Sequence, residues 1–146
     1  MRIIPYDPIY RDDMIFMILE AKDALGRRPT INPDLLDIPG EYAGRGGAFF
    51  LALSEEDRVI GSVGYQPIGD AGEVRLHRLY VKADRKRQGI GSALLRTAEA
   101  EAKKAGYRAA SVHLGADPAI WYESRAFYPK HGYRETEDER ILRKDL

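Results

Sequence analysis

A glycine-containing turn with a basic approach carries the residue types most suited to chemistry. Six residues form this turn, Lys86-Arg87-Gln88-Gly89-Ile90-Gly91. An apolar segment ending at Val81 precedes it, and the linking residues 82–87 hold four cations against one anion. Glycine lets the backbone approach a ligand closely, and a helix start offers unpaired N–H donors that favour phosphate oxygens. The sequence therefore predicts a phosphate-binding site at the start of a helix.

Two common nucleotide-binding patterns do not match this turn. A Walker A loop ends in Gly-Lys-Ser/Thr, whereas Ser92 directly follows Gly91 here. A dinucleotide fingerprint needs a third Gly or Ala where Leu94 stands, and it needs a tight turn directly after the strand. No carboxylate stands at the end of the next strand, where ribose would be bound. Both readings are therefore excluded.

The elements that position this turn follow from apolar periodicity and from turn residues. We expect strands over 2–6, 48–53, 59–66, 72–82, 108–114, 133–137 and 140–144, and helices over 8–25, 88–105 and 118–130. The stretch 27–47 is rich in Pro and Gly, and we expect it to be a loop that holds a short helix. This order predicts an α/β or α+β domain with a mixed sheet.

Two segments resemble the GNAT superfamily of N-acetyltransferases. The family signature is Gln/Arg-x-x-Gly-x-Gly/Ala between a strand and a helix, and here Lys86 stands in its first position. The segment from Arg125 to Tyr133 looks like the family's Ala-x-x-Tyr-x-x-x-Gly-Phe segment, with Tyr128 as its tyrosine. The family often has Asn seven residues before that tyrosine, where this chain has Trp121.

The resemblance implies a fold and a co-substrate. It implies one N-acetyltransferase domain over 1–146, with a mostly antiparallel sheet of about seven strands flanked by about four helices. It also implies acetyl-CoA as co-substrate and no metal. The edge of the strand near Tyr80 would pair with the pantetheine arm like an added β-strand. The residues expected to bind the cofactor are Leu79, Tyr80, Val81, Lys86, Arg87, Gln88, Gly89, Ile90, Gly91 and Ser92.

By the same resemblance, Tyr128 is the candidate general acid. Acetyl transfer from a thioester releases a thiolate, whose thiol has a pKa of about 8.5, while a phenol has a pKa of about 10. A tyrosine is therefore still protonated at neutral pH and can donate a proton to the departing sulfur. Its alternative role is that of a core aromatic on the last helix.

His77 and Glu73 are the candidate bases. Some amine acetyltransferases of the superfamily carry a histidine at the position of His77, and others carry a glutamate further back along the same strand. If side chains alternate regularly along the strand, every second residue lies on the same face; these residues are Glu73, Arg75, His77, Leu79 and Val81. A β-bulge in this strand would break that register. The alternative for His77 is a half-buried or surface side chain beside Arg75 and Arg78.

Composition limits the classes of partner. The 146 residues carry a formal net charge of +0 and no cysteine, so disulfides, thiolate nucleophiles and Cys-based metal sites are excluded. Neither a secretory leader nor a membrane-spanning run is present, which predicts a cytoplasmic protein that binds no membrane. The neutral charge argues against nucleic acid. A homodimer is possible because dimers are common in the family.

The acceptor is expected to be a primary amine of a small molecule or peptide. Its pocket would lie between the stretch 27–47, where Tyr42 could line it, and the strands near Tyr65. Arg27, Arg28 and Arg45 would suit an acceptor that carries a carboxylate, although surface positions explain them as well. Two other classes remain open: a non-catalytic acyl-CoA sensor of the same fold, and a nucleic-acid-binding domain that uses the basic residues 82–87.

Overall fold

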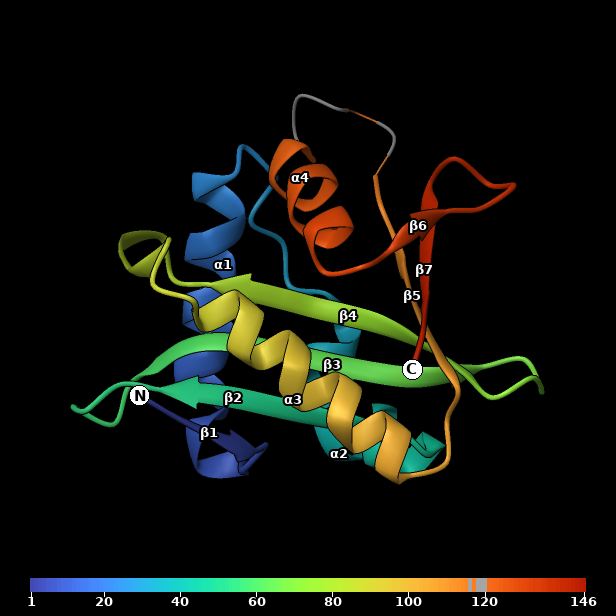
Figure 1. Ribbon diagram of the computed structural model, residues 1–146. Helices are drawn as coiled ribbons and strands as arrows, with labels where there is room; N and C mark the ends of the chain where they lie inside the picture. The colour runs from blue at the N-terminus through green and yellow to red at the C-terminus, as the bar shows by residue number, and fades with distance from the viewer. Residues whose placement is uncertain (116, 118–120) are drawn as a thin grey trace.

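The computed structural model describes residues 1–115, 117 and 121–146 and contains one seven-stranded sheet with four α-helices (Figure 1). The strands are β1 (Arg2–Pro5), β2 (Ala48–Leu53), β3 (Val59–Ile68), β4 (Glu73–Val81), β5 (Ala109–His113), β6 (Arg134–Glu135) and β7 (Ile141–Asp145). The helices are α1 (Arg11–Ala24), α2 (Ile38–Glu41), α3 (Ile90–Lys104) and α4 (Tyr122–Lys130). The predicted mixed, mostly antiparallel sheet is confirmed, and the predicted helix start at Pro118 lies outside the described residues.

The sheet has the order β1-β2-β3-β4-β5-β7-β6, and only the β4–β5 pair is parallel in the described part of the chain. In Figure 1 α3 lies in front of the sheet, and α1 and α2 lie behind it. Alternate residues of β2 divide between two cores, as the strand period requires. Phe50 belongs to the same core as Leu94 of α3 on one face, and Phe49 belongs to the same core as Met14 of α1 on the other.

A bulge in β4 changes which residues face which helix. Ser62 lies opposite Tyr80 and Gly64 lies opposite His77, so Val63 alone faces Arg78 and Leu79. Arg78 has a φ of 58°, a left-handed conformation that costs a non-glycine residue about 1–2 kcal/mol. The expected shared face from Glu73 to Val81 is therefore wrong beyond His77. Leu76, before the bulge, and both Leu79 and Val81, after it, pack on the α3 side.

β5 pairs only with the first residues of β4. The pairs run from Glu73 with Ala109 to Leu76 with Val112, and Figure 1 shows β5 running away from β4 beyond them. The last part of β4 therefore has β3 on one side and no strand on the other. Lys82 N–H bonds to Ile60 O at 2.9 Å, and backbone groups alternate along a strand. The N–H and C=O groups of Val81 and Leu79 thus point to the open side.

Candidate functional site

A cavity of about 580 Å³ lies where the open end of β4 meets the start of α3 and the face of α4. This volume is in the range of ligand pockets, about 300–1,000 Å³. All the predicted cofactor-binding residues except Gln88 line it, and so does Tyr128. Gln88 is exposed and lies outside the cavity wall. We call this space the donor cavity.

The glycine-containing turn enters α3 through two left-handed residues. Gly89, the N-cap of α3, has a φ of 78°, and Arg87 has a φ of 64°. A Cβ added at Gly89 would meet nothing within 4 Å, so glycine is needed there for its conformation and not for space. No side chain caps the helix, so its first N–H groups and the positive end of its dipole remain available to an anion.

Two side-chain contacts join the turn and α3 to α4 across the donor cavity. Lys86 Nζ lies 2.7 Å from Glu123 Oε2, and each side chain is partly exposed. Ser92 Oγ lies 3.1 Å from His131 Nε2. These contacts fix the position of α4 against the start of α3, and α4 carries Tyr128.

Tyr128 is almost fully buried, at 5% exposure, and its ring packs edge-on against Phe127 and Tyr133. Burial raises the pKa of the phenol well above its usual value, while the charge of Arg27 acts in the opposite direction. The phenol is therefore protonated at any physiological pH and is available as a proton donor. This environment suits the predicted acid.

His77 does not line the donor cavity and lies beside Tyr42, which belongs to the core on the α1 side. Its ring centroid is 6.5 Å from that of Tyr42, in an edge-on arrangement. Burial, followed by the charge of Arg78, lowers the pKa of His77 to about 4. The imidazole is therefore neutral at pH 7, and it can accept a proton there, although it is a weak base.

Glu73 lies at the far end of β4, about 26 Å from Val81 along an extended strand. Its carboxylate accepts hydrogen bonds from Arg143 Nε and Ser111 Oγ, both at 2.8 Å. Burial alone would raise the pKa of Glu73, but these two donors outweigh it and lower the pKa. The structure thus does not bring Glu73 to the donor cavity, and its contacts tie β4 to β5 and β7.

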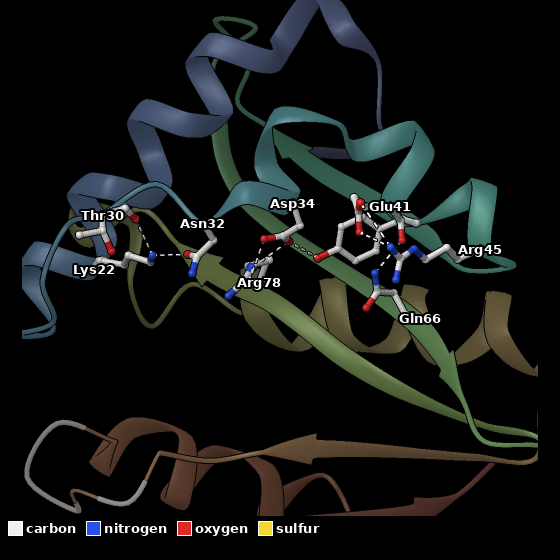
Figure 2. Close-up of polar contacts among 9 residues, drawn as sticks. Lys22, Thr30, Asn32, Asp34, Glu41, Arg45, Gln66 and Arg78 are labelled. Carbon is white, nitrogen blue, oxygen red and sulfur yellow. Dashed lines mark hydrogen bonds and ion pairs between the residues drawn. The ribbon is translucent and has the colours of Figure 1, made fainter.

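The segment 27–47 is fastened to the bulge of β4 by an ion pair that the sequence did not reveal (Figure 2). Arg78 Nη2 and Nε donate to the Asp34 carboxylate at 2.9 and 3.0 Å, and Tyr42 OH donates to Asp34 Oδ2 at 2.6 Å. Burial alone would raise the pKa of Asp34, but hydrogen bonds from Arg78 and Tyr42 outweigh it and lower the pKa. Tyr42 itself is buried at 1% exposure, and its place in an acceptor pocket stays a prediction.

Further side chains hold the same segment from other elements. The buried Lys22 of α1 donates to Thr30 O at 2.8 Å and to Asn32 Oδ1 (Figure 2). Gln66 of β3 donates to Glu41 O at 2.6 Å. The buried Tyr65 belongs to the core on the α3 side, and thus does not face this segment. The segment is therefore an ordered wall and not a free loop.

Of the three arginines expected near the acceptor, Arg27 lies elsewhere. It lines the donor cavity, and its guanidinium carbon lies 3.8 Å from the centroid of the Trp121 ring. Arg28 is exposed, and Arg45 pairs with Glu41 at 3.2 Å. Sequence reasoning missed the place of Arg27 because nothing in residues 27–47 indicates contact with α4. The one available signal for this contact was Trp121, which stands where the family often has Asn.

The rest of the described chain holds no competing site for this chemistry. A second hollow of about 680 Å³ lies between α4 and the last strands, and no predicted site residue lines it. Among residues 1–115, 117 and 121–146, no three His, Asp or Glu side chains gather as a metal would require. Over the same residues, no helix is both long enough and apolar enough to cross a bilayer.

Comparison with known proteins assigns the class to which this fold and site belong. The family model for the acetyltransferase (GNAT) domain matches residues 45–135, and the chain belongs to this family. Human N-acetyltransferase 8 is 31% identical over 111 residues, which cover 73% of this chain and 48% of that protein. Mouse N-acetyltransferase 8F1 is 32% identical over 94 residues, covering 57% of this chain and 42% of that protein. The chain thus spans about half the length of the curated relatives it matches.

Solved structures confirm the fold over the whole chain. A GNAT-family acetyltransferase from Staphylococcus aureus Mu50 has a TM-score of 0.87 at 23% identity and covers 99% of this chain and 98% of that chain. An aminoglycoside 6'-N-acetyltransferase complexed with coenzyme A has a TM-score of 0.74 at 17% identity, with coverage of 99% and 97%. A Brucella melitensis GNAT acetyltransferase in complex with acetyl-CoA has a TM-score of 0.73 at 18% identity, with coverage of 99% and 87%.

Proposed function

We propose that this protein transfers an acetyl group from acetyl-CoA to a primary amine of a small molecule or peptide, by direct attack of the amine. One observation carries the proposal: a single cavity joins an uncapped helix N-terminus, an open strand edge and the buried phenol of Tyr128. Membership of the GNAT family supports it, as do the complexes of structural neighbours with coenzyme A and acetyl-CoA.

The residues of the donor cavity fit acetyl-CoA. The N–H groups of the first turn of α3, with Lys86 and Arg87 beside them, would hold the pyrophosphate. The open main-chain groups of Leu79 and Val81 would pair with the amides of the pantetheine arm. Trp121 lacks the carboxamide of the usual Asn and has only its indole N–H as a donor, so recognition of the pantetheine amides would rest mainly on the main chain of β4.

Tyr128 acts as the general acid in this mechanism. The amine nitrogen bonds to the thioester carbonyl carbon, and the carbon–sulfur bond breaks with its electron pair on sulfur. Tyr128 gives its phenolic proton to that sulfur, and the amine loses one proton to a base. Solvent returns a proton to Tyr128, so the products are the amide and the free thiol. An open N–H group of β4 can stabilise the negative oxygen that forms on the carbonyl.

His77 is the better placed of the two candidate bases. It stands on the last part of β4, next to the bulge that leads into the donor cavity wall, and it is neutral at pH 7. It would relay the proton of the amine through water. Glu73 is held by Arg143 and Ser111 at the other end of the strand, and we assign it a structural role.

A single domain over 1–146, a cytoplasmic location and a homodimer stay predictions.

Two linked measurements test the proposed function. Thermal shift with acetyl-CoA and with desulfo-CoA tests the donor site, and free-thiol release with a panel of amines tests transfer. We expect both ligands to stabilise the protein and at least one amine to release thiol. Stabilisation without turnover on any amine would instead support the acyl-CoA sensor, and no stabilisation would overturn both.

A variant pair tests the role of Tyr128. Tyr128→Phe removes only the hydroxyl, so we expect turnover to fall about 100-fold or more, as is typical for loss of general acid catalysis, with little change in acetyl-CoA affinity. Tyr6→Phe makes the same chemical change beside β1, at the opposite edge of the sheet, and should keep full turnover. Wild-type turnover in Tyr128→Phe would contradict the assignment.

A further inference from the structure

Arg27 brings a partly buried cation, one of whose N–H donors has no partner, into the donor cavity. It follows Gly26 at the end of α1, and its N–H bonds to Lys22 O at 2.9 Å. Arg27 Nε is buried and has no hydrogen-bond partner among the described residues. A buried donor without a partner lowers stability. Arg27 lines the same cavity as Tyr128.

Trp121 holds the guanidinium in place. The guanidinium carbon lies 3.8 Å from the Trp121 centroid and 6.0 Å from that of Tyr80, which also lines the cavity. A guanidinium over the face of an indole ring is attracted by the ring electrons, which favours this position. Trp121 is itself fixed, because its indole lies against Gly115, where an added Cβ would come within 1.7 Å of Trp121 Nε1. Trp121 thus supplies a platform where the family often has Asn.

Tyr128 needs a positive charge near its oxygen if it is to donate a proton. A phenol that gives up its proton becomes a phenolate, and an isolated buried anion is strongly unfavourable. Tyr128 is 5% exposed, so water cannot stabilise that anion. Burial raises the pKa of Tyr128, and Arg27 is the group whose charge lowers it. An arginine is suited to this task because its guanidinium stays charged even when buried.

We propose that Arg27, stacked on Trp121, is a positioning residue that supplies the positive charge with which the buried Tyr128 passes its proton to the departing sulfur. This inference rests on the proposed acetyl transfer. The alternative role of Arg27 is an anchor for a phosphate of coenzyme A. The two roles differ in what they do to affinity and to turnover, so measurement separates them.

The test is a double-mutant cycle between Arg27 and Tyr128. Arg27→Gln should lower kcat about 10- to 100-fold, less than the loss of a direct oxyanion donor, while the Kd for coenzyme A by calorimetry changes less than about threefold. Arg27→Lys should recover part of kcat because it keeps the charge. In the Tyr128→Phe background, Arg27→Gln should have almost no further effect, because residues that act together are not additive.

Fluorescence of the ligand-free protein tests the stacking of Arg27 on Trp121 and does not depend on turnover. Trp121 is the only tryptophan of the chain, so its fluorescence reports on the stacked guanidinium. Arg27→Gln should change the emission intensity, whereas Arg28→Gln, which alters an exposed neighbour, should leave it unchanged. Unchanged emission in Arg27→Gln would contradict the stacking.

The remaining outcomes are distinct. A full additional loss of kcat in the Tyr128→Phe background, or a rise in the Kd for coenzyme A as large as the fall in kcat, would overturn the inference and leave the proposed function standing. An inactive wild-type protein on every amine would remove the proposed function and this inference with it.

Discussion

The two walls beside β4 are built in different ways. The turn at 86–91 on the donor side depends on backbone conformation and on an uncapped helix start, which a few adjacent residues determine. The segment 27–47, which we call the acceptor-side wall because the acceptor is predicted to bind there, is held by side chains from distant positions. Examples are Arg78 on Asp34 and Tyr107 on Gly46 (Figure 2 shows the first). A site made of backbone can therefore be recognised in sequence, whereas a wall made of long-range contacts cannot.

Breaking the Asp34–Arg78 pair should have the largest effect on stability. Removal of one partner from a fully buried pair costs about 3–5 kcal/mol. These side chains keep 15% and 24% exposure, so we expect Asp34→Ala to lower the free energy of unfolding by about 2–3 kcal/mol. Urea denaturation measures the loss. The acceptor-side wall should loosen while coenzyme A affinity changes little.

Two controls separate this pair from ordinary surface charge. Asp34→Asn keeps an acceptor for Tyr42 OH and should lose less stability than Asp34→Ala. Arg2→Ala breaks an exposed pair with Asp57, where both side chains are more than half exposed, and should cost less than about 1 kcal/mol. Equal losses in Arg2→Ala and Asp34→Ala would show that the pair does not hold the wall.

Most of the fold could be predicted because its signals are local. The strands, the helix after Gly89 and the left-handed Gly106 that ends α3 all follow from apolar spacing and glycine placement. The bulge at Arg78 could not be derived, since a non-glycine residue at positive φ is held there by Asp34, 44 positions away. The structural role of Glu73 could not be derived for the same reason, since its bond to Arg143 spans 70 positions.

On the donor side, Gly89→Ala should weaken ligand binding more than stability. Its φ of 78° disfavours alanine by about 1–2 kcal/mol, but an added Cβ would meet nothing within 4 Å. We expect unfolding free energy to fall by about 1 kcal/mol and coenzyme A affinity to fall about tenfold as the amides shift. Calorimetry and urea denaturation measure the two losses.

The opposite end of α3 provides the matched control. Gly106 has a φ of 99°, and an added Cβ there would also meet nothing within 4 Å. Gly106→Ala should therefore lose similar stability and keep the wild-type affinity for coenzyme A. If both variants bind coenzyme A alike, the backbone of the turn is not the phosphate site.

His77 should make stability depend on pH in a defined window. Burial, followed by the charge of Arg78, lowers the pKa of His77 from 6.5 to about 4. The charges of Arg75 and His113 also lower this pKa, and the charge of Asp34 raises it. Between these values the unfolded chain binds more protons than the folded one, so stability falls as pH falls from 6.5 to about 4. His77→Gln should remove a part of that slope, on the order of 1 kcal/mol.

Urea denaturation of wild type and His77→Gln at several pH values measures this difference. The two stability curves should run parallel above pH 6.5 and converge or cross below it. Parallel curves across the whole range would mean that His77 is solvated in the folded protein. The same result would weaken its placement as a neutral base beside the bulge.

The smallest expected effect lies where the acceptor-side wall ends. Tyr107 OH donates to Gly46 O at 2.6 Å in an exposed position, and such a hydrogen bond contributes about 0.5–1 kcal/mol. Tyr107→Phe should therefore lower unfolding stability by about 0.5 kcal/mol and speed amide exchange around Gly46. Tyr6→Phe, whose hydroxyl makes no hydrogen bond within the described residues, is the matched control. Because the wall is held at several separate points, loss of this one contact should loosen only its end. An effect as large as that of Asp34→Ala would mean instead that the whole segment 27–47 opens as one unit.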